Sequence, residues 1–314
     1  MSHIGTSKIG GMYLGSTKID KAYLGSQLVY SSWVEPTPNH ACLTFRSTSA
    51  MTISLTCNGS IAPVLYYSTD GTTWTLWDYS AISFSPKHPV FIYGLNSSGF
   101  SSSATNYATF TCGGSGFVDV DGDVMVLIDG VGDTLTIPCD YCFYSLFMRN
   151  TAIRTPPSFS ATTLKSDCYE RAFYGCYEMS SAPELPALTS AYRCYYQMFY
   201  ACRALVTPMT ILPATTLANQ CYGYMFYNCT AMTTAPILPA LTLVTRCYYK
   251  MFQTDAQLSY VKAMFTTTPS DTYTLDWLNG VSSSGTFVKN SVAAWTNTGT
   301  NAIPASWTIE TASS

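Results

Sequence analysis

Three aspartates spaced two residues apart form the pattern in this chain that most resembles a metal site: Asp119, Asp121 and Asp123. Carboxylates at this spacing can converge on Ca²⁺, which prefers oxygen ligands. A complete EF-hand loop would need glycine where Val124 stands and glutamate where Gly130 stands. The second aspartate and the glycine after it lie between alternating apolar residues, which favours a β-hairpin turn. We therefore expect a turn here and no metal.

Twelve cysteines are a second possible source of chemistry. Cys139 and Cys142 form a CxxC pair, which could supply half of a structural zinc site. The other half is missing, because no second pair of this kind occurs and the histidines lie outside the region where cysteines recur, at His3, His40 and His88. Neither a metal nor another cofactor is expected.

Catalytic residues are equally sparse. The chain has no GxSxG elbow, and its histidines show no local pairing with a nucleophile. Glycosidases need two carboxylates about 5–9.5 Å apart, and Glu170, Glu178 and Glu184 could approach that spacing if neighbouring repeats stack. Their context indicates solvent-exposed positions, since Tyr196 and Tyr249 stand in place of Glu170 in later repeats. We expect a protein that is not an enzyme.

Most of the cysteines belong to an internal repeat. The string Cys-aromatic-x-x-Met/Ala/Leu-Phe recurs at steps of 26, 26, 27 and 26 residues, starting at Cys142, Cys168, Cys194, Cys221 and Cys247. A second cysteine follows eight residues later in the three middle copies, at Cys176, Cys202 and Cys229. The longer step contains one extra residue between Leu205 and Pro213. Units this short cannot bury their apolar side chains alone, which predicts that they stack into a solenoid.

Each repeat is expected to contain one short helix followed by a short strand bounded by proline. At 100° per residue, the first cysteine and the residues 1, 4, 5 and 8 positions after it fall within an arc of about 140°, which predicts one buried helix face. Cysteines eight residues apart on a helix would be separated by about 12 Å, too far for a disulfide. The sequence therefore predicts reduced, buried thiols at Cys168, Cys176, Cys194, Cys202, Cys221 and Cys229.

The positions outside the buried face are rich in tyrosine and vary from repeat to repeat, whereas the inner positions hardly change. Tyrosine combines a rigid apolar ring with a hydroxyl that forms hydrogen bonds, and it loses little conformational entropy on binding. We predict a ligand-binding surface made of Tyr174, Tyr196, Tyr200, Tyr224, Tyr227 and Tyr249, together with Arg171 and Lys250. The alternative is that these side chains pack against a neighbouring loop or subunit.

The repeat resembles the bacterial leucine-rich repeats of the BspA type, in which an AFxxCxxL segment precedes a strand that ends in proline. Met225–Met232 (MFYNCTAM) carries the match, and Ala172–Cys176 and Met198–Cys202 are sister copies. The resemblance covers residues 138–265 and implies a leucine-rich-repeat-type α/β solenoid there. It implies architecture only, because the repeats of that family have no catalytic residues.

Residues 1–34 show a shorter period of ten, visible in the Leu-Gly-Ser strings that begin at Leu14 and Leu24. Glycine-containing turns between short β-prone runs predict small hairpins, and about 30 residues are too few for an independent core. Met12–Tyr30 resembles the N-terminal segment of predicted tail and fibre proteins of phages that infect gut Bacteroidetes. That resemblance implies attachment to a virion. We expect this segment to oligomerise, as a trimer in preference to other states.

The rest of the chain is expected to be rich in β-structure. Ser68–Trp74 resembles an Asp-box hairpin, which serves as a structural turn with its tryptophan in the core. Cys112–Gly116 is expected to be a hinge or linker. The expected fold class is multidomain and mainly β. Its parts are N-terminal β hairpins at 1–34, a β-sandwich at 35–116, a β connector or cap at 117–137, the solenoid at 138–265 and a β-rich C-terminal cap at 266–314.

Composition narrows the function. Charged residues make up only 11% of the chain and the net charge is -3, without a block of lysine or arginine, so nucleic acid is a poor partner. The N-terminus has no secretory signal and no apolar run is long enough to span a bilayer. We therefore expect a virion protein made in a host cytoplasm, a phage fibre or receptor-binding protein that contacts other virion proteins and a host-surface glycan or protein. The alternatives are a BspA-like adhesin on a bacterial cell surface and a glycan-degrading tail enzyme.

Overall fold

The computed structural model describes residues 12–14, 17–19, 21–24, 27–31 and 37–312. The chain forms two compact units, Met1–Thr37 and Pro38–Ser314. It is mainly β, as predicted, and the described residues contain only two short helices, α1 (Val126–Asp129) and α2 (Asp271–Thr274). No helix among the described residues is long and apolar enough to cross a membrane.

The first unit contains the predicted small hairpins. Strand β1 (Met12–Leu14) pairs antiparallel with β2 (Thr17–Ile19), and β3 (Lys21–Leu24) pairs antiparallel with β4 (Gln27–Ser31). The other residues of the predicted attachment segment at 1–34, including all of 1–11, lie outside the described residues. Its roles in attachment and oligomerisation stay predictions.

The second unit begins with two β-sheets that share one core. Their strands are β5 (Leu43–Ser47), β6 (Met51–Asn58), β7 (Leu65–Ser68), β8 (Thr75–Leu76), β9 (Ile82–Phe84), β10 (Val90–Gly94), β11 (Tyr107–Gly113), β12 (Val118–Asp121) and β13 (Ile153–Thr155). A six-stranded sheet has the order β13-β12-β5-β10-β7-β8, and a three-stranded sheet has the order β11-β6-β9. Phe45 of the first sheet contacts Phe110 of the second at 5.6 Å between ring centroids, so the two sheets pack face to face.

The segment Cys112–Gly116, predicted to be a hinge or linker, does not separate two compact units. Cys112 and Gly113 still pair with β6, and the chain then crosses directly to β12 in the other sheet within one compact unit. The predicted hairpin at Asp121-Gly122 is wrong. Gly122 does turn the chain, with φ of 92°, and a Cβ at this position would meet the carbonyl oxygen of Cys42. The chain then leads into α1 and does not return as a strand. A compact turn and a hairpin share the same glycine signal.

The Asp-box segment forms the structural turn that was predicted. The carboxylate of Asp70 accepts hydrogen bonds from the backbone N–H groups of Thr72 and Thr73 at 2.8 and 2.7 Å. Its tryptophan does not enter the core as predicted, because Trp74 is half-buried against His40 and Tyr93. The role of a core tryptophan is filled instead by Trp77, which is buried on Phe110.

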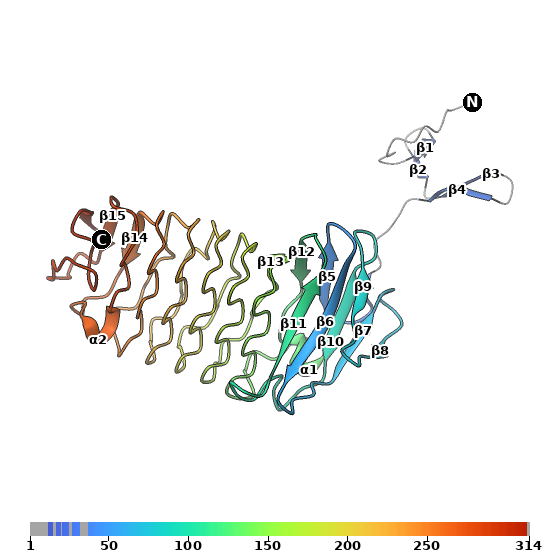
Figure 1. Ribbon diagram of the computed structural model, residues 1–314, viewed down its shortest axis with the longest axis horizontal. Helices are drawn as coiled ribbons and strands as arrows, with labels where there is room; N and C mark the ends of the chain where they lie inside the picture. The colour runs from blue at the N-terminus through green and yellow to red at the C-terminus, as the bar shows by residue number, and fades with distance from the viewer. Residues whose placement is uncertain (1–11, 15–16, 20, 25–26, 32–36, 313–314) are drawn as a thin grey trace. The chain divides into compact units, whose positions relative to one another are not determined.

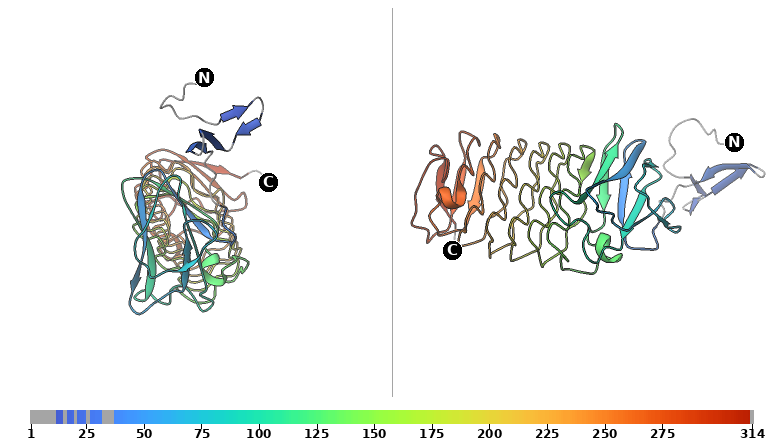
Figure 2. Two further views of the ribbon diagram at one scale, coloured as in Figure 1. Left: turned by 90° about the vertical axis from the view of Figure 1, so that its right-hand side faces the viewer. Right: turned by 60° about the horizontal axis from the view of Figure 1, so that its bottom comes forward.

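Beyond the sandwich, the chain winds into a row of stacked coils (Figure 1). Each copy of the repeat from Cys142 to Cys247 begins one coil. Seen along the row, the coils superpose (Figure 2). The predicted helices are wrong, because the cysteine-containing segments are successions of tight turns. Every fourth residue has a left-handed φ between 48° and 71°: Tyr141, Ser145 and Arg149; Asp167, Arg171 and Gly175; Arg193, Gln197 and Ala201; Gln220, Tyr224 and Asn228; Arg246, Lys250 and Thr254.

Backbone hydrogen bonds explain why such turns can stack. Along one coil, successive backbone N–H groups donate alternately to the next coil and to a carbonyl within the same coil. Tyr169 and Arg171 donate to carbonyl oxygens of the next coil at 2.9 and 3.0 Å, whereas Glu170 and Ala172 donate to the carbonyl three residues back at 3.1 and 3.2 Å. Both sets of buried amides are therefore satisfied, half within the coil and half between coils.

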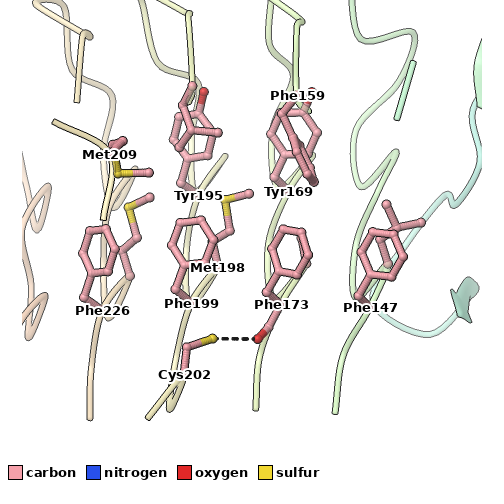
Figure 3. Packing of buried hydrophobic residues seen from close by; sticks show 14 of the residues in the cluster. Phe147, Phe159, Tyr169, Phe173, Tyr195, Met198, Phe199, Cys202, Met209 and Phe226 are labelled. Carbon is pink, nitrogen blue, oxygen red and sulfur yellow. Dashed lines mark hydrogen bonds between the residues drawn. The ribbon is translucent and has the colours of Figure 1, made fainter. Parts of the chain in front are cut away.

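The stack is filled by ladders of identical side chains (Figure 3). Phe147, Phe173, Phe199, Phe226 and Phe252 lie one above another with ring centroids 5.3–5.7 Å apart. A second row of buried rings comprises Tyr169, Tyr195, Tyr222 and Tyr248. All are at most 1% exposed, so each repeat completes the core of its neighbours.

The predicted buried thiols are confirmed: the six cysteines are fully buried and none of the twelve cysteines forms a disulfide. The second cysteine of each pair has a polar partner as well. The thiols of Cys176, Cys202 and Cys229 donate to the carbonyl oxygens of Phe147, Phe173 and Phe199 in the preceding coil, at 3.1, 3.2 and 3.1 Å. Figure 3 shows the bond from Cys202 to Phe173.

The stacking continues into the C-terminal region. Strands β14 (Tyr260–Ala263), β15 (Thr286–Lys289) and β16 (Thr308–Thr311) form one parallel sheet in that order. Three tryptophans are buried in this part of the stack, Trp277, Trp295 and Trp307. Residues 266–312 thus extend the row of coils through the same parallel pairing.

Candidate functional site

The structure brings all eight residues of the predicted binding surface together. The six tyrosines form one connected set of ring contacts, and the two cations lie over its rings. Each side chain is half-buried. We call this set the tyrosine band: Tyr174, Tyr196, Tyr200, Tyr224, Tyr227 and Tyr249, with Arg171 and Lys250.

A ladder of three rings runs through the tyrosine band. Tyr174, Tyr200 and Tyr227 occupy the same position in successive coils, and both steps of the ladder have centroids 4.6 Å apart and planes within 8° of parallel. Both faces of the Tyr200 ring are therefore covered by its neighbours. A ligand can reach the ring edges and the hydroxyl groups of this ladder, and the flat face of the central ring is closed to it.

Tyr224 connects this ladder to the remaining tyrosines. Its ring lies 5.6 Å from Tyr227, 5.6 Å from Tyr196 and 5.0 Å from Tyr249, and the last two contacts are edge-to-face. The hydroxyl groups of Tyr224 and Tyr249 are 3.4 Å apart. Burial raises the pKa of Tyr196 and Tyr200, so these phenols stay protonated and can both donate and accept hydrogen bonds.

The cations of the tyrosine band have partners within the protein. Arg171 donates to Gln197 at 2.7 Å and to the hydroxyl of Tyr144 at 2.9 Å. Lys250 lies 3.8 Å from the carboxylate of Asp276 and 5.5 Å from the ring centroid of Tyr249. These two cations are therefore already engaged, and the tyrosines of the band contribute hydroxyl groups and ring edges.

A cluster of ionic side chains contacts the band at Tyr196. Glu170, predicted to be solvent-exposed, is 2% exposed, and that prediction is wrong. Arg193 bridges Glu170 at 2.8 Å and Asp167 at 3.1 Å, and its guanidinium lies 4.2 Å from the ring centroid of Tyr196. Burial and the neighbouring Asp167 carboxyl raise the pKa of Glu170 to about 7, although Arg193 opposes this shift. The cluster fixes the position of Tyr196.

Sequence reasoning missed Asp167, Arg193 and Arg246, which share the position before the first cysteine of a repeat. Arg193 and Arg246 both lie over a tyrosine of the band, Tyr196 and Tyr249. The recurrence of arginine at this position was a usable signal. The predicted helix face began at the first cysteine of each repeat, so it did not include the residue before that cysteine.

The other candidates for chemistry do not assemble into a site. Asp119 pairs with Arg154 and Asp121 pairs with Arg46, while Asp123 accepts a hydrogen bond from the N–H of Met125 at 2.9 Å. Glu178 and Glu184 are exposed, whereas Glu170 is buried. Within the described ranges, no group of three or more histidine, cysteine or carboxylate side chains could hold a metal ion.

Cys139 is half-buried and its thiol donates to the carbonyl oxygen of Ser101 at 3.4 Å. Its CxxC partner Cys142 is fully buried, and burial raises the pKa of that thiol well above its usual range. This pair lies where the first coil meets the sandwich, and the described residues supply no second pair beside it.

Comparison with protein-family models gives no match for this chain, and comparisons with curated proteins and with solved structures give none either. A function for the chain must therefore be argued from its own geometry. The tyrosine band recurs through successive coils and combines phenol hydroxyl groups with half-buried rings that contact one another.

Proposed function

We propose that this protein is a phage fibre or receptor-binding protein that attaches a virion to a ligand on the host surface and has no enzymatic activity. The observation that carries the proposal is the tyrosine band, a row of half-buried phenols held in fixed positions across successive coils. A surface of this kind recognises a ligand without needing to reorganise, which reduces the entropic cost of binding.

The coil stack supports this role as a rigid frame. Its core ladders of phenylalanine, tyrosine and cysteine repeat almost unchanged, so residues on the outside can vary without loss of the fold. We further propose that the stack is a variant of the leucine-rich solenoids of the BspA type. The repeated string and the stacked core support this relationship, and tight turns stand where a helix was expected.

The chemistry of the tyrosine band favours a neutral ligand rich in hydroxyl groups, such as a host-surface glycan, or a polar protein epitope. The side chains of the band offer phenol hydroxyls and ring edges, and its two cations, Arg171 and Lys250, already have partners within the protein. The N-terminal hairpins supply a separate unit that is suited to contact other virion proteins, with self-association as a trimer.

Mass spectrometry of purified virions from the source culture tests the virion assignment. We expect peptides of this chain at the copy number of a fibre, in proportion to the major capsid protein. Its absence from virions would overturn the proposal, and its presence in the envelope of uninfected bacteria would point to a bacterial surface adhesin instead. A glycan-degrading activity in the purified chain would contradict the non-enzymatic role.

A further inference from the structure

One hydrogen bond between coils is absent at a position where other coils have it. Twelve positions after the first cysteine, the backbone N–H donates to the preceding coil: Ser180 to Arg154 at 3.2 Å, Val206 to Ser180 at 3.1 Å and Ser259 to Thr233 at 2.9 Å. The corresponding bond from Thr233 to Val206 is missing. Within residues 37–312, the N–H of Thr233 has no hydrogen-bond acceptor.

The third coil also differs in sequence from its neighbours beside this gap. The repeat that begins at Cys194 is the one that contains an extra residue, between Leu205 and Pro213. It also has Pro208 where Ala182 and Ala235 donate their N–H groups to the next coil. The first coil has a proline at the same position, Pro156, and keeps its bond between Ser180 and Arg154, so the extra residue is the distinguishing feature.

Thr233 is one of the residues that line a hollow of about 360 Å³, which the third, fourth and fifth coils form together. Val206, Pro208, Ile237 and Tyr260 supply its apolar walls, and Met209 lines it as well. Val206 and Tyr260 are accessible, with 56% and 36% of their surface exposed. Its volume lies in the range of small-molecule sites, which combine apolar walls with a few hydrogen-bonding groups.

The lining decides which ligand fits. None of its ten residues is charged, so an ionic ligand would lose hydration without gaining a counter-charge. Four of the ten are threonines, at positions 207, 210, 233 and 234, and the free N–H of Thr233 adds a donor. The ring of Tyr260 offers an aromatic surface beside them. This combination suits a polyol with one apolar face.

We propose that this hollow binds one neutral sugar residue of a glycan chain. The site is separate from the tyrosine band in the repeat, because its residues lie 12 to 16 positions after the first cysteine, whereas those of the band lie 2 to 6 positions after it. Sugar binding in the hollow does not depend on the proposed function, and the hollow and the tyrosine band are tested by different variants.

Saturation-transfer NMR on the full chain tests the site. The probes are two neutral glycosides, methyl α-L-fucopyranoside and methyl α-D-mannopyranoside, and one anionic glycoside, methyl β-D-glucuronide. We expect a neutral glycoside to bind with a dissociation constant of about 1–10 mM and the glucuronide to bind at least about tenfold more weakly, because its carboxylate finds no partner.

Val206→Lys places an ammonium group at the mouth of the hollow, and Tyr260→Ala removes the ring. Each should abolish the saturation transfer to the neutral glycoside while the melting temperature stays close to that of the parent chain. Leu241→Lys is the matched control, because Leu241 is equally exposed at 55% and lies outside the lining. The proposal is overturned if neither neutral glycoside binds, if the glucuronide binds equally well, or if both variants retain full binding.

Discussion

Asp255 is a buried carboxyl group whose replacement should make the protein more stable. Its side chain is fully buried in the fifth coil, where it occupies the position of the second cysteine. Oδ1 accepts a hydrogen bond from the N–H of Cys229 at 2.7 Å, whereas Oδ2 has no partner. Burial raises the pKa of Asp255 well above its usual range.

The neighbouring coils show what this position requires. In the second, third and fourth coils a thiol donates to the phenylalanine carbonyl of the preceding coil. In the first coil, Asn150 donates from Nδ2 to the carbonyl oxygen of Phe110 at 3.2 Å. Asp255→Asn should therefore keep the bond to Cys229 and gain a donor that faces the carbonyl of Phe226. We expect stability at pH 8 to rise by about 1–3 kcal/mol.

The pH dependence has a definite sign. A carboxyl group whose pKa is raised in the folded state binds more protons when folded, so stability falls as pH rises above the unfolded value of 3.8. The slope approaches about 1.4 kcal/mol per pH unit until the folded group ionises. Glu170 adds to the same trend between pH 4.5 and about 7. The parent chain should therefore be more stable at pH 5 than at pH 8, and Asp255→Asn should reduce that difference.

Guanidinium unfolding followed by circular dichroism at pH 5, 6.5 and 8 measures both effects. Asp133→Asn serves as the matched control, because Asp133 is exposed and should change neither the midpoint nor its pH dependence. A loss of stability in Asp255→Asn that is equal at pH 5 and pH 8 would refute the reasoning, since it would mean that an ionised Asp255 stabilises the fold.

Three further outcomes are expected. Phe199→Ala should cost about 3–5 kcal/mol, because its ring is sandwiched between Phe173 and Phe226 with centroids 5.7 and 5.4 Å away; a cost below about 1 kcal/mol would mean that the ladder contributes little. A truncated chain that starts at Glu35 should be monomeric in light scattering while the full chain is a trimer, and identical monomer masses would count against oligomerisation through residues 1–34. Without reductant, labelling of the buried thiols should be negligible in the native state and complete in denaturant. Failure to label them after unfolding would contradict free thiols at Cys168, Cys176, Cys194, Cys202, Cys221 and Cys229.

The buried face of the repeat could be predicted from sequence, although its backbone could not. The residues assigned to the core, such as Cys194, Tyr195, Met198, Phe199 and Cys202, are all at most 1% exposed. They are spaced 0, 1, 4, 5 and 8 positions along the chain, which fits a turn every four residues as well as a helix with 3.6 residues per turn. Over nine residues the two periods differ too little to be separated by a hydrophobic pattern.

The surface was predicted less completely than the core. The outer tyrosines could be identified because they recur at fixed positions, and the structure places them in contact. Glu170 was misassigned because a single carboxylate looks exposed in sequence. Its burial depends on Arg193, which is 23 residues away in the chain and becomes a neighbour only when coils stack. Ionic partners of this kind are set by the tertiary structure.

Binding of the purified full chain to host cells, compared between the parent and the double variant Tyr200→Ser, Tyr227→Ser, tests the role of the tyrosine band most directly. Tyr177→Ser, Tyr192→Ser is the matched control, because both tyrosines are exposed and lie outside the band. The account predicts that the band variant loses binding, that the control keeps it, and that both melt within a few degrees of the parent. Unchanged binding by the band variant, or a collapse of its melting temperature, would contradict the account and assign these side chains to packing.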